Sequence, residues 1–214
     1  MSFNVKHIAI AGNIGAGKTT LTTKLAQHFG WDVHYEDTDN NPYLSDFYDD
    51  MQRWSFNLQI YFLNSRYRQV LNIQQGDRTV IQDRSIYEDA HIFAPNLHDM
   101  GLMSHRDYEN YFNLFTLMQQ HVAPPDLMIY LRASVPTLIS HISQRGRDYE
   151  NSISLDYLER LNEQYEKWIA NYTEGRLLII PIDNLDFQNN TADFEKVLNL
   201  VQKEFHGFVE PKFA

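Results

Sequence analysis

The fold is decided by the segment Gly12-Asn13-Ile14-Gly15-Ala16-Gly17-Lys18-Thr19, which matches the phosphate-loop pattern G-x-x-x-x-G-K-[ST]. The apolar run Val5–Ala11 precedes it and Thr19–Phe29 follows with apolar residues at helical spacing, so the segment joins an expected strand to an expected helix. Its glycines let backbone N–H groups surround phosphate oxygens at the positive end of the helix. Lys18 is placed to bind the β- and γ-phosphates, and the Thr19 hydroxyl to bind Mg²⁺. The segment predicts a nucleotide site but does not define the reaction.

Strands and helices are expected to alternate along the rest of the chain. Further strands are expected at Val33–Glu36, Thr79–Gln82, Leu127–Leu131 and Leu177–Ile180. Helices are expected at Leu44–Asp50, Arg53–Gln74, Ser85–Ala94 (ending before Pro95), Arg106–His121, Val135–Gln144, Ser154–Asn171 and Thr191–Phe205. This alternation predicts an α/β fold, with a five-stranded parallel sheet and helices on both faces. With no repeat or linker in view, residues 1–214 are expected to form a single domain.

Composition limits the classes of partner. The 214 residues include 18 Lys and Arg against 28 Asp and Glu, a formal net charge of −10, which disfavours binding to nucleic acid or an anionic membrane. No apolar run approaches the roughly 20 residues of a membrane span. With no cysteine, disulfides and thiolate chemistry are excluded. We expect a soluble, cytoplasmic protein with no nucleic-acid or membrane partner.

The motifs around the phosphate loop favour a small-molecule kinase. A guanine-reading Asn-Lys-x-Asp motif is missing, and Asp83 is followed by Arg84-Ser85-Ile86 rather than by the Asp-x-x-Gly of a switch protein. Arg145-Gly146-Arg147 lies between two expected helices, where two guanidinium groups could close over a triphosphate and neutralise the charge on the transferred group. A solvated basic loop is the alternative for this cluster taken alone. Beside a phosphate loop, we interpret it as an arginine-bearing lid of about residues 144–152.

Five segments in order, together with Glu36 at the end of the second expected strand, resemble the deoxynucleoside kinase family. The segments are GNIGAGKTT (12–20), RWSFNLQIYFLNSR (53–66), DRSIYED (83–89), RGRDYE (145–150) and LDYLERLNEQYEKW (155–168). The resemblance covers nearly the whole chain and implies a P-loop kinase fold. It implies transfer of the ATP γ-phosphate, with Mg²⁺, to the 5′-hydroxyl of a deoxynucleoside. It also implies a homodimer and feedback inhibition by a deoxynucleoside triphosphate.

The resemblance assigns roles in phosphoryl transfer. Glu36 corresponds to the general base that takes the 5′-hydroxyl proton; spacing alone leaves Asp37 and Asp39 as rivals. Asp83 and Thr19 correspond to Mg²⁺ ligands, and Arg84 to the residue that binds the 5′-hydroxyl region and the transferred phosphate. The implied catalytic set is Lys18, Glu36, Arg84, Arg145 and Arg147. The implied ATP site comprises Gly12, Asn13, Ile14, Gly15, Ala16, Gly17, Lys18, Thr19, Thr20, Arg145 and Phe187, the last expected against the adenine.

The nucleoside pocket is expected on one face of the long helix. Gln59, Phe62 and Arg66 lie at i, i+3 and i+7 and share that face. A buried Arg66 requires a carboxylate, for which Asp89 is the natural partner. The implied nucleoside site comprises Tyr48 and Glu150 at the sugar 3′-hydroxyl, Gln59, Arg66 and Asp89 at the base, Phe93 as a stacking wall, and Phe62.

The base-reading residues favour a purine. In the family an Arg–Asp pair accompanies deoxyadenosine, deoxyguanosine and deoxycytidine, so we predict a purine deoxynucleoside, with deoxyadenosine first. Deoxyguanosine or deoxycytidine kinase is the nearest alternative. A nucleoside monophosphate kinase is a further one, although Glu36 suits a hydroxyl acceptor better than a phosphorylated one. The non-enzymatic alternative is a nucleotide-binding regulatory subunit.

His141 is the main departure from the family pattern, because relatives carry an arginine one helical turn before Arg145. A neutral histidine supplies no permanent charge to the transition state. We therefore predict a modest loss of kcat at high pH that His141→Arg removes. The pH profile of kcat for both proteins tests this, and an unchanged profile in the variant would contradict it.

Overall fold

The computed structural model describes residues 5–36, 38, 41–147 and 153–206. It contains one five-stranded sheet of order β2-β3-β1-β4-β5, in which every neighbouring pair is parallel. The strands are β1 (His7–Gly12), β2 (Asp32–His34), β3 (Val80–Asp83), β4 (Leu127–Arg132) and β5 (Arg176–Pro181). The predicted α/β class and parallel sheet are confirmed.

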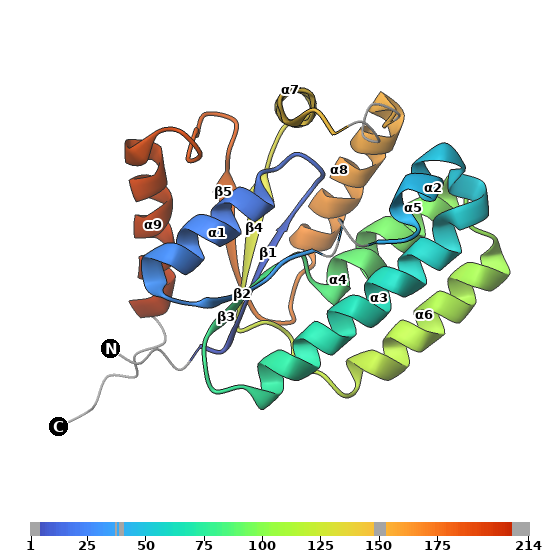
Figure 1. Ribbon diagram of the computed structural model, residues 1–214, viewed down its shortest axis with the longest axis horizontal. Helices are drawn as coiled ribbons and strands as arrows, with labels where there is room; N and C mark the ends of the chain where they lie inside the picture. The colour runs from blue at the N-terminus through green and yellow to red at the C-terminus, as the bar shows by residue number, and fades with distance from the viewer. Residues whose placement is uncertain (1–4, 37, 39–40, 148–152, 207–214) are drawn as a thin grey trace.

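Helices cover both faces of the sheet (Figure 1). They are α1 (Lys18–Phe29), α2 (Leu44–Asp49), α3 (Met51–Gln75), α4 (Ile86–Glu88), α5 (Ala94–Asp99), α6 (His105–Gln119), α7 (Val135–Arg145), α8 (Leu155–Ala170) and α9 (Thr191–His206), with a π-helical segment η1 (Asp89–Phe93). Within the described residues, none of these helices combines the length and apolar character that a membrane crossing requires.

Two apolar cores result from the alternation of side chains along the strands. In β1, Ile8 and Ile10 are fully buried against a cluster that includes residues of α1, α7 and α9. Ala9 and Ala11 face the opposite cluster, which includes residues of α3, α5, α6 and α8. Both faces of the strand are therefore buried, which explains why its sequence is almost continuously apolar.

The functional segments follow the carboxyl ends of neighbouring strands. β1 leads directly into the phosphate loop, and Ile10 of β1 pairs with Asp83, the last residue of β3. β2 pairs with β3 and ends two residues before Glu36. In parallel sheets, ligands bind at this edge. The topology therefore places the phosphate loop, Asp83 and Glu36 together.

The expected end of the helix Ser85–Ala94 before Pro95 is wrong. The chain continues through α4, η1 and α5 as far as Asp99. In η1 the backbone N–H of Ala94 bonds to the carbonyl of Asp89 five residues earlier. Pro95 then falls at the first positions of α5, where its missing N–H removes no required hydrogen bond. This π turn carries Asp89 and Phe93, and both side chains line the same cavity.

His7 starts β1 in a buried hydrogen-bonded chain. Its Nε2 lies 2.8 Å from Oε1 of Gln82, whose Nε2 donates to Oε1 of Gln69. Burial lowers the pKa of His7 to about 4. The folded protein therefore binds this proton more weakly than the unfolded chain does. Neutral His7 contributes its full stability above the unfolded pKa of about 6.5, and that contribution is lost as the pH falls towards 4.

We predict that the free energy of unfolding falls more steeply on acidification in the wild type than in His7→Gln. Between about pH 7 and pH 4 the difference should be at most about 3 kcal/mol, since each pKa unit corresponds to about 1.4 kcal/mol. Denaturant unfolding at a series of pH values measures both slopes. Parallel curves would show that His7 does not set the acid limit.

Candidate active site

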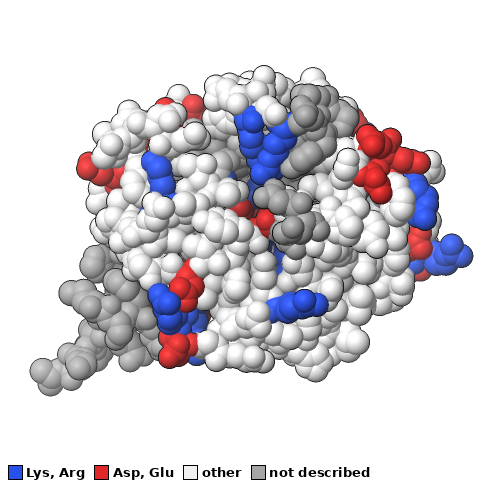
Figure 2. All heavy atoms as spheres, in the orientation of Figure 1, with Lys and Arg blue, Asp and Glu red and all other residues white. Residues whose placement is uncertain are grey.

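A cavity of about 1000 Å³ opens at the carboxyl edge of the sheet. Figure 2 shows its mouth, where positively charged side chains lie above negatively charged ones. The predicted residues that line it are Ile14, Gly15, Gly17, Lys18, Thr19, Thr20, Glu36, Tyr48, Gln59, Phe62, Asp83, Arg84, Asp89, Phe93, Arg145, Arg147 and Phe187. Four others lie outside the lining: Gly12, Asn13, Ala16 and Arg66. Glu150 and lid residues 148–152 fall outside the described part of the chain.

The phosphate loop has a backbone that only glycine adopts readily. Gly15 and Gly17 both have φ of 84°. A Cβ at Gly15 would lie 2.8 Å from the carbonyl oxygen of Leu138, so this position also lacks room for a side chain. Lys18 begins α1, and its Nζ donates to the carbonyls of Gly12 (2.9 Å) and Asn13 (3.0 Å). Burial, with Arg84 nearby, lowers the pKa of Lys18 to about 8.

Thr19 and Asp83 provide oxygen atoms suited to a magnesium ion. The Thr19 hydroxyl donates to Oδ2 of Asp83 at 2.5 Å, and Oδ1 of Asp83 is buried without a hydrogen bond to the described residues. Burial raises the pKa of Asp83, although Lys18 opposes this shift. The described residues hold no cluster of three or more His, Asp or Glu for a metal. Mg²⁺ often binds to one or two protein oxygens together with phosphates and waters, so the two residues fit it.

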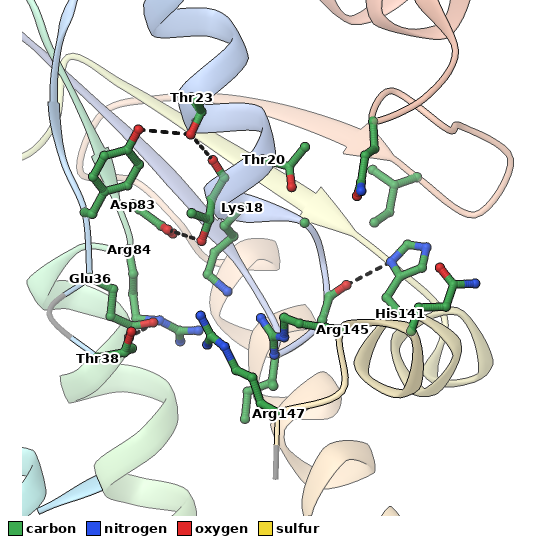
Figure 3. Close-up of a pocket in the computed structure, with 18 of the residues that line it drawn as sticks. Lys18, Thr20, Thr23, Glu36, Thr38, Asp83, Arg84, His141, Arg145 and Arg147 are labelled. Atoms are coloured by element: carbon green, nitrogen blue, oxygen red, sulfur yellow. Dashed lines mark hydrogen bonds and ion pairs between the residues drawn. The ribbon is translucent and has the colours of Figure 1, made fainter. Parts of the chain in front are cut away.

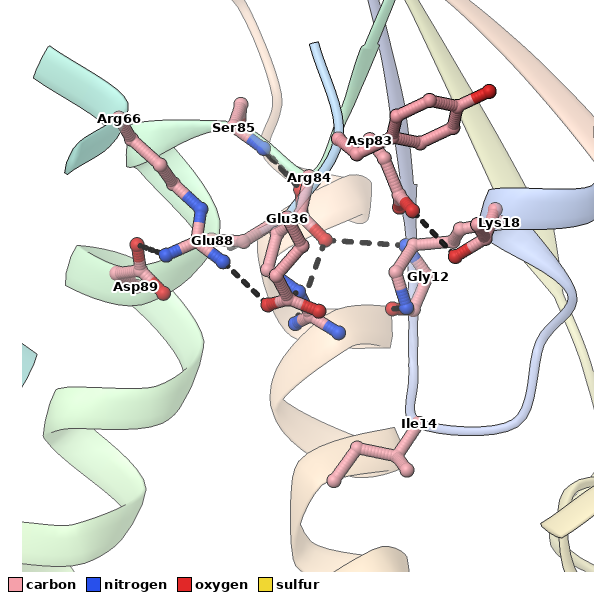
Figure 4. Close-up of polar contacts among 12 residues, drawn as sticks. Gly12, Ile14, Lys18, Glu36, Arg66, Asp83, Arg84, Ser85, Glu88 and Asp89 are labelled. Atoms are coloured by element: carbon pink, nitrogen blue, oxygen red, sulfur yellow. Dashed lines mark hydrogen bonds and ion pairs between the residues drawn. The ribbon is translucent and has the colours of Figure 1, made fainter. Parts of the chain in front are cut away.

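A buried ion-pair network joins Arg66 and Asp89, which were predicted to contact the base, to Glu36 (Figure 4). Arg66 contacts Oδ2 of Asp89 through Nη1 and Oε1 of Glu36 through Nη2, each at 2.5 Å. Arg84 approaches the same Glu36 oxygen through Nε at 3.1 Å. The predicted partnership of Arg66 with Asp89 is present in the structure. The contact of Arg66 with Glu36 was not predicted.

The pKa values of the two carboxylates in this network, Glu36 and Asp89, are shifted in opposite directions. Burial alone would raise the pKa of Glu36, but Arg84 and Arg66 together lower it to about 2. For Asp89, burial outweighs Arg66 and Arg84 and raises the pKa to about 7. Glu36 therefore stays ionised at any working pH, whereas the charge of Asp89 depends on its arginine partners.

Aromatic rings fix the two guanidinium groups. The guanidinium carbon of Arg66 lies 4.5 Å from the ring centroid of Phe62, and that of Arg84 lies 4.4 Å from that of Phe93. Cation–π contacts of this kind hold a guanidinium plane against the ring. Phe62 and Phe93 thus orient the arginines as well as lining the cavity.

The described residues of the segment predicted as a lid lie near the phosphate loop. Arg145 and Arg147 extend from the end of α7 into the cavity, on the side where Lys18 and Glu36 lie (Figure 3). His141, one turn earlier, has Nδ1 2.9 Å from the carbonyl oxygen of Gly15. His141, which replaces the arginine expected from the family pattern, therefore contacts the phosphate loop itself.

Phe187 lies at the other side of the phosphate loop. Its side chain is buried, and its ring is so close to Gly17 that a Cβ there would lie 3.0 Å from it. The carbonyls of Phe187 and Gln188 accept hydrogen bonds from Nζ of Lys24, each at 2.7 Å. These two hydrogen bonds hold the loop that contains Phe187 against α1.

Glu88 and Tyr165 are buried beside the site and were missed by the sequence analysis. Both lie within quoted segments, DRSIYED and LDYLERLNEQYEKW, yet neither residue was given a role there. The available signal is the pattern Ser85-x-x-Glu88, a capping box that the structure contains at the start of α4. Nothing in the sequence marked Tyr165 among the many aromatic residues.

Comparisons with known proteins identify relatives over nearly the whole chain. Residues 8–206 match the family model described as deoxynucleoside kinase. The deoxyadenosine/deoxycytidine kinase of Bacillus subtilis (strain 168) is 39% identical over 201 residues, 93% of this chain and 93% of the relative. The deoxyguanosine kinase of the same organism is 37% identical over 194 residues, 89% and 93% of the two chains. Deoxyadenosine kinase from M. mycoides, solved with bound dATP, superimposes with a TM-score of 0.81 at 30% identity, covering 92% of this chain and 99% of that one.

Proposed function

Because the chain belongs to the deoxynucleoside kinase family, and is therefore an enzyme that transfers phosphate from a nucleotide to a deoxynucleoside, we propose that its substrate is a purine deoxynucleoside, with deoxyadenosine first. The donor is ATP with Mg²⁺, and the acceptor is the 5′-hydroxyl. Residues 1–214 act as one kinase domain. Deoxyguanosine or deoxycytidine remains the alternative acceptor within the family.

The observation that supports this proposal most directly is the position of Gln59 beside the Arg66–Asp89 pair. Gln59 is 2% exposed and lines the cavity, and its Oε1 makes no hydrogen bond with the described residues. A buried amide without a partner costs free energy unless a ligand supplies one. The amino group and ring nitrogen of adenine offer a donor and an acceptor side by side, which an amide matches.

The names of the relatives support the same class of acceptor. The Bacillus subtilis relative acts on deoxyadenosine and deoxycytidine by name, and a second curated relative, from Dictyostelium discoideum, is a deoxyadenosine kinase that is 37% identical over 201 residues. Adenine and cytosine both present an amino group next to a ring nitrogen. This shared edge is consistent with Gln59 as the reader. Deoxyadenosine is our first choice, since it is common to the names of both relatives.

Glu36 is the proposed general base. As the 5′-oxygen forms its bond to the γ-phosphorus, Glu36 takes the hydroxyl proton and the bond to the leaving ADP oxygen breaks. The low pKa of Glu36 keeps it ionised, so it accepts a hydrogen bond from the hydroxyl before the reaction. Arg84, at 3.1 Å from Glu36, is proposed to bind the transferred phosphate next to this base.

Lys18, Arg145 and Arg147 are proposed to stabilise the phosphate charge. All three line the cavity around the phosphate loop. A bound Mg²⁺ would supply positive charge that offsets the negative charge of the phosphates. Thr19 and Asp83 would hold it, and Thr20, Ile14 and Phe187 complete the proposed ATP contacts together with the loop backbone. Tyr48 lines the acceptor side of the same cavity and is proposed at the 3′-hydroxyl, with Glu150 as its partner in that role.

The remaining proposals concern assembly and regulation. We propose a cytoplasmic homodimer, in which α3 and α6 are the candidate interface helices; Leu117 of α6 is 56% exposed in the single chain. We also propose feedback inhibition by a deoxynucleoside triphosphate. Structures of the M. mycoides relative with bound dATP and with bound dCTP support that proposal.

A substrate panel tests the acceptor. With ATP and Mg²⁺, kcat/KM should be highest for deoxyadenosine and low for ribonucleosides and for nucleoside monophosphates. Gln59→Leu should lower kcat/KM for deoxyadenosine by about 10–100-fold, the cost of one buried hydrogen bond. Gln74→Leu, at an exposed position of the same helix, is the control. Preference for deoxyguanosine, or an unaffected Gln59→Leu, would overturn the assignment of the base.

Replacement of Glu36 tests the general base. Glu36→Gln should lower kcat by about 10²–10⁴-fold, the usual contribution of a positioned base. The dissociation constant for deoxyadenosine, measured by calorimetry, should change by less than about 5-fold, which corresponds to less than about 1 kcal/mol of binding free energy. Glu166→Gln is the matched control, because Glu166 is half-exposed and pairs with Arg132 away from the cavity. Retained kcat in Glu36→Gln would exclude the role.

A further inference from the structure

We propose that Glu88 and Tyr165 form a buried positioning pair that holds Arg84 against the end of β1. Glu88 is fully buried at the end of α4 and Tyr165 is fully buried on α8, and neither lines the cavity. They therefore do not contact a nucleoside or ATP there. The inference rests on the role proposed above for Arg84 in phosphoryl transfer.

Glu88 joins the phosphate loop to the segment that carries Arg84. Its Oε1 accepts the backbone N–H of Gly12 at 3.2 Å, and its Oε2 accepts the backbone N–H of Ser85 at 2.8 Å (Figure 4). Gly12 is the first residue of the phosphate loop, and Ser85 directly follows Arg84. One carboxylate thus fixes both backbones that flank the proposed phosphoryl-transfer site.

Tyr165 contacts the same two segments through its hydroxyl. The oxygen lies 2.8 Å from the Gly12 carbonyl and 2.8 Å from Oε1 of Glu88, and it accepts a hydrogen bond from Nη1 of Arg84 at 3.0 Å. A phenol has one proton, so only one of the two oxygens accepts it at a time. The hydroxyl therefore connects the guanidinium of Arg84 to the phosphate-loop backbone directly.

Arg84 needs such support because its backbone is strained. Among the described residues it alone, apart from glycines, has a positive φ, at 71°. A left-handed conformation at a residue with a side chain costs about 1–3 kcal/mol and persists only where the surroundings impose it. The backbone N–H of Arg84 bonds to the carbonyl of Ile10 at 3.0 Å, and the side chain is held by Tyr165, Phe93 and Glu36.

The Tyr165 hydroxyl also provides a second hydrogen-bond donor to the Gly12 carbonyl. This oxygen accepts from Nζ of Lys18 at 2.9 Å and also faces the Tyr165 hydroxyl. Lys18 has three N–H donors, and any donor that it turns to a bound phosphate no longer serves this carbonyl. Tyr165 then remains as the donor to the Gly12 carbonyl, which avoids a buried unpaired acceptor. The pair thereby supports the loop while Lys18 changes partners.

Tyr165→Phe tests the pair, with Tyr130→Phe as the matched control. The two rings stack at 5.7 Å, but the hydroxyl of Tyr130 bonds to Glu166, outside this network. We expect Tyr165→Phe to lower kcat by about 10–100-fold while the KM values for ATP and nucleoside change by less than about 3-fold, as for an interaction needed in the transition state. Tyr130→Phe should stay within about 2-fold of the wild type. Glu88→Gln, which keeps the shape but replaces one acceptor with a donor, should lower kcat similarly.

A double-mutant cycle with Arg84→Lys separates a role through Arg84 from a general structural one. Lysine retains the charge but loses the planar guanidinium. If Tyr165 acts through Arg84, adding Tyr165→Phe to Arg84→Lys should lower kcat by less than about 3-fold more, because interacting residues are not additive. Full additivity, an unchanged kcat in Tyr165→Phe, or a loss confined to KM would overturn the proposal. An active Arg84→Lys would instead overturn the role of Arg84 itself, so the two failures are distinguishable.

Discussion

The site depends on the burial of charged groups that must neutralise one another. Lys18, Arg66 and Arg84 contribute three positive charges, each at most 7% exposed, and Asp83, Glu88 and Asp89 contribute three buried carboxylates. Glu36 adds a fourth carboxylate at 23% side-chain exposure. An unpaired buried charge is far more costly than a paired one, so removing a single member leaves its partner uncompensated. Arginine suits such sites because its fork donates to two carboxylates at once, as Arg66 does.

This requirement explains the irregular backbone around the site. The charged side chains must converge from α1, α3, β3, α4, η1 and the chain after β2, although regular helices and strands would direct some of them elsewhere. Arg84 adopts a positive φ directly after β3, and the π turn η1 places Asp89 and Phe93 on one side of the cavity. Arg84 carries one of the two guanidinium groups, and Asp89 and Phe93 in η1 contact the guanidinium groups of Arg66 and Arg84. The strain is local and is offset by the hydrogen bonds and ion pairs that it permits.

Much of the fold was predictable because it depends on local patterns. The apolar strands, the phosphate-loop sequence and Gly30 after α1 each indicate structure within a few residues, and the parallel sheet follows from their alternation. The continuation of the helix past Pro95 was not predictable. It depends on a π-helical hydrogen bond in η1, which spans five residues instead of the four of an α-helix. Likewise, helical spacing brought Gln59 and Arg66 together. It gave no information on Tyr165, which meets Gly12 from 153 residues away in the chain.

The proposed sites of base recognition and of reaction at the 5′-hydroxyl share one side chain, that of Arg66. Arg66 contacts Asp89, proposed to face the base, and Glu36, the proposed general base, through adjacent nitrogens of the same guanidinium. Arg66 is one of the cations that keep the pKa of Glu36 low, so under the proposed roles a base bound at Asp89 would act on Glu36 through Arg66. The ring of Phe62 limits how far that guanidinium turns. The proposed roles therefore link base specificity to the electrostatics of Glu36 as well as to the residues that line the pocket.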